Sequence, residues 1–151
     1  GVNGERTDQI AARFDRDVVA AKPAVVIILA GVNDVYQGRA AEHVTGQLQA
    51  MYARAREAGI PVVAGTIVPY NTATADQNAR MRAVNGWIQT ASAADANVWF
   101  ADTRAAAAHA DDPDRLAGSP DELHPDIDGY PRMAGALLPA PDAALAAKAG
   151  A

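Results

Sequence analysis

The sequence predicts an α/β fold, a three-layer α/β/α sandwich built around a parallel sheet. Three observations lead to this prediction. Short β-branched apolar runs alternate with longer amphipathic stretches, Pro or Gly residues bound those runs, and 151 residues is the length of one domain. Strands that are separated by helices pair in parallel through right-handed crossovers. We therefore expect residues 1–151 to form a single domain with the order α-β-α-β-α-β-α.

Three apolar runs are the predicted strands, at residues 25–29, 61–68 and 97–101. The first run, Val25-Val26-Ile27-Ile28-Leu29, is continuously apolar, which predicts a strand buried on both faces. It has the character of a central strand, yet no earlier run in the chain can pair with its far side. Such sheets usually have ~4–6 strands. We therefore expect that N-terminal strands are missing from this chain and that one edge of the 25–29 strand is exposed.

Apolar residues at helical spacing fill the gaps between these runs. They predict helices over residues 5–21, 44–55, 81–91 and 130–138, with a short helix after the third strand. Pro139 and Pro141 should break the last helix and leave a final turn from Asp142. Residues 109–128 are polar and contain Pro, which predicts a long loop of the kind that is functional or disordered.

Composition and charge exclude several classes of protein. Half of the residues are apolar and 21% are charged, which is typical of a globular chain and not of a disordered one. The longest apolar run, Ala24 to Ala30, is far shorter than the ~20 residues of a transmembrane helix. The net charge of −5 argues against nucleic acid as a partner. The absence of Cys excludes disulfides, thiolate nucleophiles and Cys-ligated zinc.

Two short motifs follow predicted strands, where parallel sheets bind their ligands. In the first, A-G-V-N-D at residues 30–34, the side-chain amide of Asn33 can donate a hydrogen bond to an oxyanion. In the second, D-E-L-H-P-D at residues 121–126, Asp121 and His124 can meet on one tight turn. The carboxylate would then hold the imidazole Nδ1–H and leave Nε2 as a general base.

Each motif also has a purely structural interpretation. Gly and Asn are ordinary residues of the turn that follows a strand. Asp121 can cap the following helix, with His124 as a surface residue of the loop.

Taken together, the two motifs resemble those of the SGNH hydrolases, also called the GDSL esterase/lipase family. Gly31-Val32-Asn33-Asp34 matches the G-x-N-D block of that family, and Asp121 to Pro125 matches its D-x-x-H-P block. Gly4 matches the Gly of a further block that lies in a turn near the second strand. The order and spacing of these matches cover the whole chain, and the resemblance implies a flavodoxin-like SGNH fold.

The resemblance also implies a reaction and a role for each matching residue. The reaction is hydrolysis of a small-molecule carboxylic ester through an acyl-serine intermediate, with no metal and no cofactor. His124 would be the general base, and Asp121 would orient it. The Gly4 backbone N–H and the Asn33 side chain would form two arms of the oxyanion hole.

The Gly-Asp-Ser block that carries the nucleophile in this family is absent. The serines of the chain are Ser92 and Ser119, and both are expected to be ordinary helix or turn residues, because neither follows a strand. We therefore expect an N-terminally truncated hydrolase, with two further strands and a helix ahead of Gly1. The exposed edge of the 25–29 strand should then promote self-association.

Three other interpretations stay open at this stage. The first is a non-catalytic ligand-binding protein that kept the scaffold and lost the serine. The second is a calcium site among the acidic residues of the late loop, but Leu137 stands where the twelfth position of a calcium loop requires Glu. The third is a nucleotide-binding domain, but no glycine-rich phosphate-binding motif follows any strand.

Overall fold

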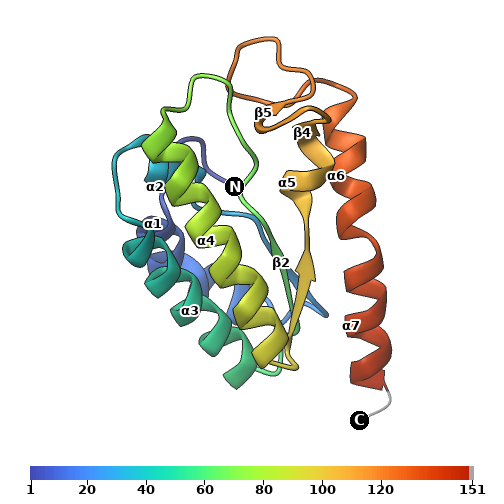
Figure 1. The fold of residues 1–151 in the computed structure, drawn as a ribbon. Helices are drawn as coiled ribbons and strands as arrows, with labels where there is room; N and C mark the ends of the chain where they lie inside the picture. Colours follow the sequence, from blue (N-terminus) through green and yellow to red (C-terminus); the bar gives the residue numbers. More distant parts are fainter. Residues whose placement is uncertain (150–151) are drawn as a thin grey trace.

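The main sheet of the protein is parallel and lies between two helical layers. A computed structural model describes residues 1–149 (Figure 1). The strands are β1 (Val26–Ile28), β2 (Val62–Gly65) and β3 (Val98–Ala101), in the order β1-β2-β3. Val26 pairs with Val62, and Val62 pairs with Val98. The predicted α/β sandwich with a parallel sheet is therefore confirmed.

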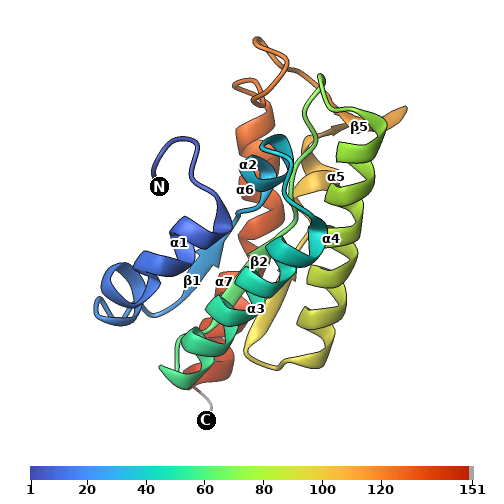
Figure 2. The same cartoon turned by 90° about the vertical axis from the view of Figure 1, so that its left-hand side faces the viewer.

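One face of the sheet is covered by the helices of the N-terminal half. These are α1 (Thr7–Phe14), its continuation as the π-helix η1 (Asp15–Val19), α3 (Ala41–Glu57) and α4 (Ala75–Ala94). Figures 1 and 2 show α7 (Pro139–Ala149) on the opposite face. Successive side chains along β2 point to opposite faces of the sheet, as in any β-strand. Val62 and Ala64 pack in the hydrophobic core with residues of α3 and α4. Val63 packs on the other face with Ala140 of α7.

Helices α3 and α4 extend beyond the apolar stripes that predict them at residues 44–55 and 81–91. In α4 the N-terminus is set by Thr74, whose hydroxyl accepts from the Gln77 backbone N–H at 3.2 Å. The Gln77 side chain accepts in turn from the Thr74 N–H at 2.8 Å, which completes a capping box. The helix therefore begins six residues before Met81, the first apolar residue of the stripe that predicts it. None of the helices within residues 1–149 has the length and apolar character that crossing a lipid bilayer requires.

The prediction that the first strand is buried on both faces is wrong. Ile28 is buried, but Ile27 is 48% exposed and Leu29 is 42% exposed. Ile27 pairs with Val63 and therefore faces the same side of the sheet as α7. Because α7 packs over β2 and β3, it leaves this end of the sheet uncovered. Within residues 1–149, β2 is the one strand that pairs with β1.

The C-terminal third differs most from the prediction. The expected loop contains an antiparallel hairpin of β4 (Ala108–His109) and β5 (Asp112–Leu116), which follows the short helix α5 (Thr103–Ala107). Helix α6 (Gly129–Leu137) comes next. Pro139 and Pro141 do not leave a short final turn but lie in the first turn of α7, where Pro is tolerated because the first N–H groups of a helix have no partner inside it.

Candidate active site

The first motif forms a sharp turn between β1 and a short helix, α2 (Val32–Tyr36). Gly31 caps this helix with φ +119°, a conformation that L side chains rarely adopt. A Cβ at Gly31 would lie 2.7 Å from Ile67 Cδ1 and 2.9 Å from Val44 Cγ1. The turn therefore needs Gly for both its dihedral angle and its space, and it places Asn33 at the carboxyl end of β1.

The side chain of Asn33 is held from the N-terminal segment. Its Nδ2 donates to the backbone carbonyl of Glu5 at 3.0 Å. An amide nitrogen has two hydrogens, so this bond fixes the orientation of the group and leaves a second donor. Gln37, one turn later, donates to the Gly4 carbonyl at 3.1 Å. The hydrogen bonds from Asn33 and Gln37 thus connect α2 and the residue after it to residues 4–5.

The second motif forms the expected Asp–His pair. Asp121 Oδ2 lies 2.7 Å from His124 Nδ1, and Asp121 Oδ1 accepts from the backbone N–H groups of Leu123 and His124 at 3.0 and 2.8 Å. The hydrogen bond from His124, followed by the two backbone bonds, holds the pKa of Asp121 well below its ordinary value. An ionised carboxylate can only accept, so Nδ1 carries the proton and Nε2 has the lone pair that a base needs.

This turn is anchored to the loop after β2. Glu122 adopts φ +63°, which is unusual for a residue with a side chain, and its carbonyl accepts from the Asn71 backbone N–H at 2.8 Å. The Asn71 side-chain oxygen accepts in addition from the Leu116 N–H at 2.8 Å. Asn71 therefore connects β5 to the turn that carries Asp121 and His124. The sequence gives no signal for this connection, because Asn71 is far from both partners along the chain.

The two motifs line one cavity of about 260 Å³. Asn33 and His124 both contribute to its wall. Tyr36 and Tyr70 form an edge-to-face pair in the same wall, with ring centroids 5.7 Å apart. The other lining residues are Asn3, Val32, Val68, Leu123 and Pro125. A mainly apolar cavity with an imidazole and an amide is suited to a small uncharged ligand that carries a polar reacting group.

The structure thus brings together three of the four predicted site residues, Asp121, His124 and Asn33. Gly4 is not among the residues that line the cavity, although its neighbour Asn3 is, and the Gly4 N–H makes no hydrogen bond within residues 1–149. Ser92 lies on α4 and donates to the Ile88 carbonyl at 2.8 Å, as an ordinary helix serine does.

A separate cluster of side chains of the kinds that bind metals includes Asp34 of α2. Among residues 1–149, Asp8, Asp34 and His43 are the group of three whose ligand atoms approach within 4.8 Å of one another. Both carboxylates are already engaged: Asp34 accepts two hydrogen bonds from Thr7, and Asp8 pairs with the Arg6 guanidinium at 3.0 Å. A cation would compete with that guanidinium, so the cluster does not fit a metal site.

Comparison with known proteins assigns the family. The model of the GDSL-like lipase/acylhydrolase family matches residues 1–132. The chain belongs to this family. A search of curated proteins gives no significant match.

Solved structures with the same fold include a GDSL-like lipase from Bacteroides thetaiotaomicron, at 23% identity and a TM-score of 0.87. That match covers 95% of this family member and 74% of the other chain. A carbohydrate esterase of family 3 from Talaromyces cellulolyticus shares 27% identity at a TM-score of 0.72, over 94% and 69% of the two chains. A variant of an acetyl-xylooligosaccharide esterase from Geobacillus shares 21% identity at a TM-score of 0.77, over 93% and 69%.

Proposed function

We propose that the protein hydrolyses carboxylic esters, with His124 as the general base and Asp121 as the group that orients it. The observation that carries this proposal is the 2.7 Å contact between Asp121 Oδ2 and His124 Nδ1 at a cavity that Asn33 also lines. Membership of an acylhydrolase family and the esterase relatives support it. The proposal requires a serine nucleophile, a role that neither Ser92, bonded within α4, nor Ser119, 3.5 Å from Asp121, fills in this structure.

The proposed reaction has two balanced halves. His124 Nε2 takes the proton of the serine hydroxyl while the serine oxygen attacks the ester carbonyl carbon. The oxyanion that forms accepts hydrogen bonds from the second Asn33 N–H and the Gly4 backbone N–H. The alcohol leaves with the proton from His124, and the acyl group stays on the serine. Water repeats the cycle and releases the carboxylic acid.

A non-catalytic ligand-binding protein is the second candidate. The observation that favours it is the position of the two serines of the chain. Ser92 bonds within α4, and Ser119 donates to the Asp121 carboxylate at 3.5 Å instead of pairing with the His124 imidazole. On this interpretation the apolar cavity binds an acyl ligand without turnover.

The intact mass and N-terminal sequence of the protein from its natural source separate the two candidates. A segment ahead of Gly1 that contains a strand followed by Gly-Asp-Ser supports the hydrolase. In that full-length protein, His124→Ala should lower the turnover of 4-nitrophenyl acetate by roughly 10²–10⁴-fold, and Asn33→Ala by roughly 10²–10³-fold. Ile127→Ala is the control, because Ile127 lies in the same loop and is 85% exposed. A natural N-terminus at Gly1, or unchanged turnover in His124→Ala, contradicts the proposal.

A further inference from the structure

A small apolar cavity, of about 160 Å³, adjoins the cavity that Asn33 and His124 line. It lies where the chain leaves β1 and β2, and its walls are Leu29, Ala30, Val32, Ile67 and Val68. Val32 and Val68 line both cavities, so the two spaces have these two side chains as a common boundary. The small cavity is therefore a neighbour of the candidate active site and not a separate feature of the surface.

The walls of the small cavity offer apolar contacts to a ligand. All of the side chains that line it are aliphatic. The backbone N–H and carbonyl of Ile67 are already bonded to the side-chain amide of Asn85, at 2.7 and 2.9 Å. A polar group that entered would lose its hydrogen bonds to water, and these side chains would not replace them. The cavity therefore fits an aliphatic group.

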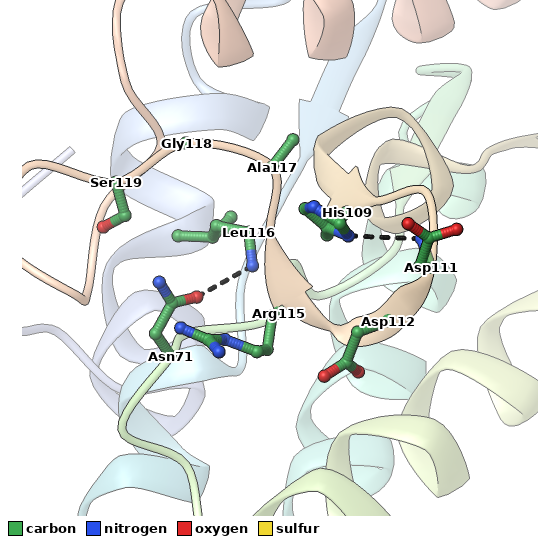
Figure 3. A pocket seen from close by; sticks show the side chains of 9 residues that line it. All are labelled: Asn71, His109, Asp111, Asp112, Arg115, Leu116, Ala117, Gly118 and Ser119. Carbon is green, nitrogen blue, oxygen red and sulfur yellow. Dashed lines mark hydrogen bonds between the residues drawn. The ribbon is translucent and has the colours of Figure 1, made fainter.

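A larger cavity, of about 340 Å³, lies beside the β4–β5 hairpin and does not suit such a group (Figure 3). Its walls include the charged residues Asp111, Asp112 and Arg115, which an aliphatic group would separate from water without pairing them. It also shares no lining residue with the cavity at His124. Of these two cavities, the small one combines apolar walls with a boundary to the candidate active site.

The volume of the small cavity limits the size of the aliphatic group. An apolar cavity of about 150 Å³ takes up a molecule the size of benzene, and this one has about 160 Å³. It therefore accommodates an alkyl chain of about four to six carbons. Leu29 forms a wall that is 42% exposed, so a longer chain would pass out of the cavity into water.

The half of the ester that enters the small cavity follows from the proposed reaction. Val32 directly precedes Asn33, whose second N–H would bind the oxyanion, whereas His124 is not among the walls of the small cavity. The acyl chain is attached to the carbon that carries the oxyanion, and the alcohol leaves with the proton of His124. We infer that the small cavity binds the acyl chain, and that the preferred substrates are esters of straight-chain acids of about four to six carbons; this assignment rests on the proposed function above.

Binding of the chain can be measured without turnover. The probe is hexanamide, an uncharged analogue of the ester that resists hydrolysis. It is added to the full-length protein, with ¹³C-labelled Leu, Ile and Val methyl groups, up to about 20 mM, where a millimolar site is largely filled. We expect saturable shifts of the Leu29 and Ile67 methyl signals, because these residues line the small cavity and not the one at His124. Acetamide, which lacks the chain, should not shift them. Ala30→Leu replaces a methyl group of the wall with an isobutyl group and should abolish the response to hexanamide.

Selectivity for chain length is the second measurement. Each buried methylene contributes roughly fourfold to binding, so kcat/KM for 4-nitrophenyl butanoate should exceed that for the acetate about tenfold. The decanoate should show no gain over the hexanoate. Leu29→Ala removes part of the wall and should lower the hexanoate-to-acetate ratio of kcat/KM about tenfold. Ile27→Ala is the matched control, because Ile27 is an apolar residue of the same segment that is 48% exposed and does not line the cavity, so the ratio should stay the same.

The outcomes separate this inference from the proposed function. Leu29 and Ile67 signals that do not respond to hexanamide, or a response that persists in Ala30→Leu, overturn the acyl cavity whatever the fate of His124. A response in the 151-residue chain that is lost in the full-length protein also overturns it, because a segment ahead of Gly1 then fills the cavity. Hexanamide binding with ester turnover that persists in His124→Ala overturns the proposed function and with it the assignment of the cavity to the acyl chain.

Discussion

Thr7 makes two hydrogen bonds to the carboxylate of Asp34, from its backbone N–H at 2.8 Å and from its hydroxyl at 2.7 Å, and both residues are completely buried. The contact joins the first turn of α1 to α2. Asp34 follows Asn33 directly, so the same contact fixes the helix that carries the candidate oxyanion donor. A buried carboxylate is tolerated here because its oxygens have donors of the right geometry.

Removal of the Thr7 hydroxyl should therefore destabilise the protein. Thr7→Val keeps the shape of the side chain and leaves Asp34 Oδ1 without its donor. We expect a loss of about 1–3 kcal/mol in the free energy of unfolding, measured by urea denaturation. Thr90→Val is the matched control, because the Thr90 hydroxyl is exposed and bonds within its own helix, so its effect should stay within about 0.5 kcal/mol. Equal midpoints for the two variants would contradict the role of Thr7.

A second prediction concerns the turn at Gly31. Gly31→Ala introduces a Cβ that meets Ile67 and Val44 at less than 3 Å, in a residue with φ +119°. We expect a loss of about 1–3 kcal/mol in unfolding free energy from the overpacking. Gly46→Ala is the opposite case, because Gly46 lies inside α3 with nothing within 4 Å of its Cβ position. It should stabilise the protein by about 0.5–1 kcal/mol. Calorimetric unfolding that ranks the two variants the other way would refute this explanation.

Local chemistry explains which parts of this fold are predictable from sequence. The three strands and the helices between them follow from apolar periodicity, which records burial directly. The Asp121–His124 pair was predictable because a spacing of three on a tight turn brings both side chains together without help from distant residues. The position of Asn33 at the cavity was predictable because residues that follow a strand in a parallel sheet lie at the edge where ligands bind.

The features that sequence reasoning missed depend on distant residues. The β4–β5 hairpin lacks alternating apolar residues: its strand β5 reads Asp-Pro-Asp-Arg-Leu. It is held instead by Arg104, which is buried and donates from Nη2 to Asp114 Oδ1 at 2.7 Å, and by an ion pair of Asp114 with Arg82. Such charge pairs leave no periodic signal in the sequence. The exposure of Ile27 was missed because burial of a strand depends on how far the covering helix extends.

The pH dependence of the candidate catalytic pair follows from Asp121. Because its folded pKa is lowered, mainly by the hydrogen bond with His124, its contribution to stability is present above the ordinary Asp pKa of about 3.9 and is lost as pH falls through the lower, folded pKa. We expect an NMR titration of the carboxyl carbon to give a midpoint below that of an ordinary Asp.

The variant His124→Ala should raise that midpoint. It removes the largest cause of the shift and leaves the backbone N–H donors of residues 123 and 124 in place, so the midpoint should move toward the ordinary value and remain below it. Ile127→Ala, in the same loop, should leave the Asp121 midpoint where it is. A midpoint that does not respond to His124→Ala would show that the 2.7 Å pair does not form in solution.

The edge of β1 gives the last prediction. Within residues 1–149, β1 pairs on one side only, and Ile27 and Leu29 expose apolar side chains beside its unpaired edge. Such an edge is a template for pairing with another chain. We expect the 151-residue chain to associate as its concentration rises, measured by light scattering. Ile27→Lys should favour the monomer, because a charge on an edge strand opposes pairing and an exposed position tolerates it. Ile127→Lys makes the same substitution at an exposed residue away from the sheet and should leave association unchanged. If the unsubstituted chain remains a monomer at high concentration, the β1 edge does not act as a pairing surface.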